Sequence, residues 1–297
     1  MPSSSSLQQD PDELWSMRNQ YYVGNYDGVF SEAESAMVDS GSVLSDEKEL
    51  FIQLARLAQG ELEMDATQSG VEFKALDLLF QLNREEAPIS QLLQELKRLV
   101  DEDGAKNARL RLLAASAFAQ HSSDPNDALR ILFPVKRNLE VMRLETYIYL
   151  AMDRLDLATT KVEEMKQVDE DSTLCQLAMA LVGLYRPDQV QESVEVLREL
   201  TSKWVPTPLL ASALSTGLIA QQKFQQALDA IGEVDETGGG DKPAALYLNS
   251  ICAAQHLGQR LDEYIGGLKS VDPSNAWFGD MATSSANFDQ AAARFLQ

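Results

Sequence analysis

The chain has 297 residues, of which 44% are hydrophobic and 24% charged, and its formal net charge is −21. A protein that binds nucleic acid or docks directly on anionic lipid needs a basic patch, so this acidic balance argues against both classes. No window approaches the roughly 18 consecutive apolar residues of a membrane-spanning helix. The two cysteines, Cys175 and Cys252, give no disulfide framework. We therefore expect a soluble, intracellular protein.

The N-terminal third predicts a series of helices. Residues 1–9 have neither the basic nor the apolar region of a signal peptide, and we expect them to form a short disordered tail. The expected helices, separated by breaks at Gly, Ser and Pro, span residues 12–22, 26–38, 46–63, 71–83, 88–102 and 106–120. How these helices pair between residues 40 and 105 stays open.

Further along, an apolar triplet with offsets of +4 and +7 returns five times. These offsets place the three side chains of a triplet on one stripe of a helix. The triplets are Ala128/Leu132/Val135, Ala158/Val162/Met165, Ser193/Leu197/Leu200, Ala227/Ile231/Val234 and Tyr264/Leu268/Val271, and a weaker one is Val29/Ala33/Ala36. The first members of the five lie 30, 35, 34 and 37 residues apart, and a period of about 34 residues is typical of tetratricopeptide repeats.

Turn residues three positions before each triplet predict where the second helix of each pair begins. These residues are Pro125, Leu155, Val190, Phe224 and Leu261. We therefore expect an all-α fold, a tetratricopeptide-like right-handed superhelix, or α-solenoid, of antiparallel helix pairs. It should span residues 10–297 as one domain, with a C-terminal capping helix at about 284–296.

No pattern in the chain predicts catalysis or a metal site. The two histidines, His121 and His256, are far apart and lack clustered ligands. The glycine run at residues 238–240 lacks the spacing of a phosphate-binding loop and is followed by Pro243, which has no N–H donor. We expect no enzyme, no cofactor and no metal.

Repeat arrays of this kind bind other proteins, commonly in the concave groove that the first helices of successive pairs line. Counting back from each triplet gives the side chains expected in this groove. They are Arg143, Tyr147, Val182, Tyr185, Ser212, Thr216, Asn249 and His256. Aromatic, polar and charged groups in this mixture suit a long peptide or an element of a partner protein.

Several segments resemble the coatomer ε-subunit family of the COPI vesicle coat. The most specific match is the run from Lys166 to Ala178, Lys-Gln-Val-Asp-Glu-Asp-Ser-Thr-Leu-Cys-Gln-Leu-Ala, which a generic helical repeat does not require. Residues 152–158, just before this run, belong to the same telling segment, and supporting matches lie at residues 12–14, 22–26, 126–129, 255–258 and 287–289. Residues 60–105 and 273–285 match less well.

The resemblance implies a structural, non-catalytic subunit of coatomer that holds the C-terminal domain of the α subunit within the heptameric complex. It also implies retrograde Golgi-to-ER and intra-Golgi transport, a cytoplasmic location, and peripheral association with Golgi membranes and COPI-coated vesicles through other subunits. The alternative is a tetratricopeptide co-chaperone or other scaffold that binds a partner peptide in the groove. A co-chaperone clamp for acidic peptides would need several basic side chains there, and the predicted groove offers chiefly Arg143.

Overall fold

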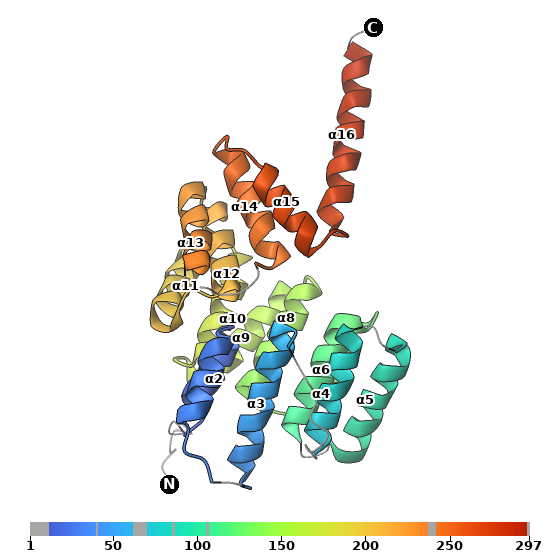
Figure 1. Cartoon of the computed structure of the whole chain (residues 1–297), viewed down its shortest axis with the longest axis vertical. Coiled ribbons are helices and arrows are strands. Elements are labelled where there is room, and N and C mark those ends of the chain that lie inside the picture. The colour runs from blue at the N-terminus through green and yellow to red at the C-terminus, as the bar shows by residue number, and fades with distance from the viewer. Residues whose placement is uncertain are drawn as a thin grey trace. The chain divides into compact units, whose positions relative to one another are not determined.

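A computed structural model describes residues 12–39, 41–61, 70–84, 87–104, 107–236 and 242–295. These residues form sixteen α-helices and no strand, and the chain divides between residues 205 and 206 into two compact units (Figure 1). The tail expected at residues 1–9 and the glycine run at 238–240 lie outside the described residues. The prediction of an all-α fold of paired helices is confirmed.

The first unit contains helices α1 to α11. Their bounds are α1 (Trp15–Tyr22), α2 (Tyr26–Ser35), α3 (Val43–Gln59), α4 (Val71–Asn83), α5 (Ile89–Asp103), α6 (Ala108–His121), α7 (Pro125–Leu132), α8 (Leu139–Ala151), α9 (Leu155–Asp169), α10 (Thr173–Leu184) and α11 (Val190–Trp204). Consecutive helices pack as pairs, with α6 on α7, α8 on α9 and α10 on α11. The second helices begin at Pro125, Leu155 and Val190, as their turn residues predict.

The second unit contains helices α12 to α16. Their bounds are α12 (Pro208–Ala220), α13 (Phe224–Glu236), α14 (Ala244–His256), α15 (Asp262–Val271) and α16 (Ala276–Phe295). Helix α12 packs on α13, and α14 packs on α15. The terminal helix starts at Ala276, so it is longer than the 284–296 segment expected from the sequence, and Met281 and Phe288 are 49% and 72% exposed.

Side-chain caps explain why several helices begin where they do. Asn107, Asn138, Ser172 and Thr207 each precede a helix and accept a hydrogen bond from the backbone N–H three residues on. Such a cap satisfies one of the N–H groups that the first turn of a helix leaves without a partner. Short polar residues therefore fix the starts of α6, α8, α10 and α12.

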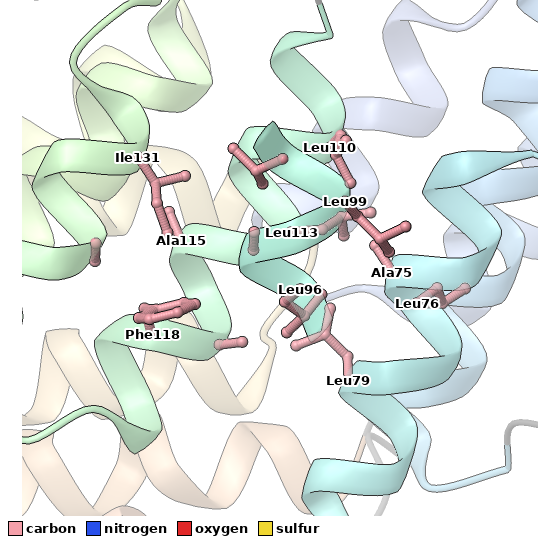
Figure 2. Packing of buried hydrophobic residues seen from close by; sticks show 14 of the residues in the cluster. Ala75, Leu76, Leu79, Leu96, Leu99, Leu110, Leu113, Ala115, Phe118 and Ile131 are labelled. Carbon is pink, nitrogen blue, oxygen red and sulfur yellow. The ribbon is translucent and has the colours of Figure 1, made fainter. Parts of the chain in front are cut away.

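The repeated triplets form the seams between helices. In the triplet that begins at Ser193 all three residues are at most 3% exposed, and in the one that begins at Ala158 they are at most 4% exposed. The N-terminal half of unit 1 has its own apolar cluster, in which Leu76, Leu96 and Leu110 from α4, α5 and α6 meet (Figure 2). In the last triplet Leu268 is buried but Val271 is 45% exposed, so the stripe is incomplete at the end of α15.

Helix α1 has contacts that the repeat pattern does not predict. It packs against α10 as well as against its neighbours α2 and α3. Leu14 and Met17 are at most 1% exposed, and the Trp15 ring lies 6.0 Å from that of Trp204, centroid to centroid. The N-terminal helices are thus joined to later first helices of the same unit.

Candidate partner-binding face

Arg143 on α8 lies beside aromatic side chains from the N-terminal helices. Its guanidinium carbon is 6.0 Å from the centroid of the Tyr22 ring, and it interacts electrostatically with Tyr21 and Tyr26. No carboxylate of the described residues forms an ion pair with Arg143. Burial lowers the pKa of Arg143, while Tyr21 and Glu140 oppose that shift.

A network of ion pairs connects the same helices. Glu47 on α3 accepts hydrogen bonds from Arg18 at 3.0 Å and from Arg109 at 2.8 Å. Arg109 also donates a hydrogen bond to Glu140, three residues before Arg143 on α8. These contacts favour one packing of α1, α3, α6 and α8, because a helix that moved away would leave the charge of its partner poorly solvated.

Burial also shifts titrations within this network. It raises the pKa of Glu140 to about 7, although the guanidinium groups of Arg18 and Arg143 oppose that shift. It raises the pKa of Tyr21 to about 12, so this phenol stays protonated at neutral pH. The network supports the fold around Arg143, and no part of it presents an exposed catalytic group.

Tyr147 and Tyr185 are the exposed aromatic residues among the predicted groove side chains. They are 60% and 59% exposed, whereas Ile148 and Val182 on the same helices are 2% and 4% exposed. Tyr147 lies one turn after Arg143 on α8, and α8 packs against α10, which ends just before Tyr185. We call Arg143, Tyr147 and Tyr185 the tyrosine face.

The four predicted groove residues of the second unit make contacts with one another or with neighbours. The amide nitrogen of Asn249 on α14 donates to the Ser212 carbonyl at 3.1 Å and to the Thr216 hydroxyl at 3.1 Å. His256 is exposed and stacks on Phe224, with ring centroids 4.2 Å apart and planes 3° from parallel. Asn249 therefore ties α14 to α12, and His256 covers the start of α13.

The described residues give little support to metal binding, thiol chemistry or a membrane-spanning helix. They contain no group of three or more His, Cys, Asp or Glu side chains placed to hold a metal ion. Burial raises the pKa of the Cys175 thiol to about 11, which makes the reactive thiolate scarce at neutral pH. Among the helices of the described ranges, none combines the length and apolarity that crossing a bilayer requires.

Sequence reasoning missed the tyrosines that surround Arg143. Tyr21, Tyr22 and Tyr26 are visible as an aromatic cluster, but their helices carry no strong repeat register. Nothing local indicates that they approach α8, since more than 100 residues separate them from Arg143 in the chain. The signal that the sequence offered for this contact was the positive charge of Arg143 on α8, because a cation within a fold needs an acidic or aromatic neighbour.

Comparison with known proteins supports the same architecture. A solved tetratricopeptide repeat protein from Parabacteroides merdae superposes with a TM-score of 0.55 at 13% identity, covering 90% of this chain and 95% of that one. This likeness concerns the fold alone.

Sequence relatives extend over nearly the whole chain. Coatomer subunit epsilon-1 of Arabidopsis thaliana is 25% identical over 291 residues, which cover 96% of this chain and 98% of the relative. Coatomer subunit epsilon of Caenorhabditis elegans is 26% identical, with 95% and 98% covered. The family profile described as coatomer epsilon subunit matches residues 10–296. The chain therefore belongs to the coatomer epsilon subunit family.

Proposed function

We propose that this protein is a structural, non-catalytic subunit of the COPI coat that holds the C-terminal domain of the α subunit of coatomer. In this role it acts in retrograde Golgi-to-ER and intra-Golgi transport. It resides in the cytoplasm and reaches Golgi membranes and coated vesicles through the other subunits of the heptamer. The family membership supports the place in coatomer, and the tyrosine face supports the mode of binding.

The exposure of Tyr147 and Tyr185 carries the proposal. The other large apolar side chains of α8 and α10 are buried or partly buried, so two rings with more than half of their surface in water stand out. Tyrosine is enriched at binding hot spots, because its ring buries a large area and its hydroxyl still finds a polar partner. A partner segment that covers both rings would remove this apolar surface from water.

The tyrosine face also argues against a co-chaperone. Capture of an acidic C-terminal peptide needs several cations around one carboxylate, and the tyrosine face contributes a single one, Arg143. A coat subunit that presents apolar and mixed polar side chains fits this face better.

Affinity purification of the full-length chain from cytosol, followed by mass spectrometry, tests the proposal. We expect the α subunit and the other coatomer subunits to co-purify in constant ratio. Recovery of a chaperone without coat subunits would overturn the proposal. A chain carrying Leu197→Asp, which disrupts the core of unit 1, serves as the control for contacts that need the fold.

A further inference from the structure

This acidic chain contains two pairs of adjacent basic residues, and the two pairs differ in the ion pairs that they form. In the first pair, Lys97-Arg98, the guanidinium of Arg98 binds Glu95 at 2.5 Å and Glu102 at 2.7 Å within its own helix. The second pair, Lys136-Arg137, lies in the loop between α7 and α8, and both residues are exposed. In the part of the chain that the structure describes, none of the ion pairs includes Lys136 or Arg137.

This second pair borders a cavity of about 230 Å³ on unit 1. Apolar side chains, Val135, Met142 and Val168, form part of its wall. Two carboxylates also line it, but Lys161 engages both, with its ammonium nitrogen 3.1 Å from Glu145 and 2.7 Å from Glu164. The positive charges at the rim of the cavity therefore have no counterion inside it.

An exposed aromatic ring extends the same surface. Phe133 is 68% exposed, and the ammonium nitrogen of Lys136 lies 3.9 Å from its ring centroid. A cation over a ring face is attracted by the ring quadrupole, so Lys136 and Phe133 hold each other in place before any ligand arrives. The loop thus offers an aromatic ring and two cations beside a cavity whose wall is partly apolar.

We propose that this surface binds a short acidic segment of a partner protein, which inserts an apolar side chain into the cavity and places carboxylates on Lys136 and Arg137. Charge complementarity carries the proposal, since Lys136 and Arg137 are adjacent and exposed beside this cavity in a chain with a net charge of −21. An anionic membrane fits less well. A flat lipid surface cannot fill the cavity, and the acidic remainder of the chain would be repelled from it.

This site is separate from the tyrosine face, because it is built from the loop before α8 and from the outer positions of α8 and α9. Arg143 and Tyr147 do not line the cavity. The surface can therefore hold a second partner, or a second segment of the same partner, while the tyrosine face is occupied. A substitution that abolishes binding at one surface should therefore leave binding at the other surface unchanged.

A phage-displayed library of random 12-residue peptides, panned on the full-length chain, tests this proposal. We expect enrichment of peptides in which carboxylates flank a Leu, Ile, Met or Phe. Synthetic versions should bind in fluorescence anisotropy, and their affinity should fall as salt rises. Substituting Lys136→Gln with Arg137→Gln should weaken binding about tenfold, the order expected when two charge contacts are lost.

The matched control is Lys97→Gln with Arg98→Gln, which removes the same two charges at the other basic pair. It should leave peptide affinity unchanged, and Phe133→Ser should weaken binding without changing net charge. The proposal is overturned if no acidic peptides are enriched, or if both double variants bind alike. It is equally overturned if vesicles containing phosphatidylserine bind the chain through Lys136 and Arg137 while the peptides do not. Binding of the α subunit by the Lys136→Gln/Arg137→Gln variant tests the proposed function separately.

Discussion

Leu197 lies in the middle of the third triplet, on α11, and is 0% exposed. Replacing its side chain with a smaller one removes buried methyl groups and leaves a cavity, which costs about 3 kcal/mol or more at a wholly buried site. In Leu197→Asp a carboxyl group without a hydrogen-bond partner adds about 2 kcal/mol. The sum, about 5 kcal/mol, is comparable with the whole stability of a small domain. We therefore expect the α10–α11 pair to lose its packing.

Thermal and urea unfolding followed by circular dichroism measure this effect. For a unit of this size a loss of about 5 kcal/mol lowers the melting temperature by roughly 10 to 20 °C. Gln191→Asp is the matched control, because it puts the same carboxylate on the exposed face of the same helix. It should change stability by no more than about 0.5 kcal/mol. If Leu197→Asp has the same melting temperature as the parent protein, then the triplets do not form the seams between helices.

Three further predictions concern unit 1 and the two thiols. Because the folded protein holds a proton on Glu140 up to pH about 7 while the unfolded chain releases it near 4.5, the stabilisation from this group is complete below pH 4.5 and is lost as pH rises to 7. Urea unfolding should show this loss in the parent protein and not in Glu140→Gln. A Cβ on Gly183 would lie 2.1 Å from the Ser193 hydroxyl oxygen, so Gly183→Ala should destabilise by about 1 to 2 kcal/mol. In a Ser193→Ala background the same change should be neutral or stabilising, since Ala is the better helix former, and equal effects in both backgrounds would disprove the contact. Ellman's reagent should modify the partly exposed Cys252 first and buried Cys175 only on unfolding, whereas equal rates in the folded protein would contradict the burial of Cys175.

Local patterns in the sequence were sufficient to place the repeated helices. The offsets within a triplet follow from the geometry of one helix, and a Pro or a capping residue at the turn fixes where the helix begins. Pro125 and Phe224 begin α7 and α13 as their positions predict. Val271 differs because its burial depends on a following helix, and α16 leaves it 45% exposed.

The surroundings of Arg143 could not be predicted in the same way. A repeat register describes how each pair packs on the next, whereas the contact of α1 with α10 joins segments more than 150 residues apart. Trp15 and Tyr22 make further long-range contacts, with Trp204 at the end of α11 and with Arg143 on α8, through aromatic packing that has no fixed spacing in the sequence. Tyr147 and Tyr185, in contrast, were selected from the repeat register alone, and both are exposed, whereas their role in binding stays a prediction.

Isothermal titration calorimetry with the C-terminal domain of the α subunit tests the central claim most directly. The parent chain should bind this domain as a one-to-one complex. Tyr147→Ala combined with Tyr185→Ala should lower the affinity at least about tenfold, because each truncated hot-spot ring costs more than 1 kcal/mol. Circular dichroism should show an unchanged fold, since both rings are exposed. An affinity equal to that of the parent chain would contradict binding through the tyrosine face, and absence of binding by the parent chain would contradict the proposed partner.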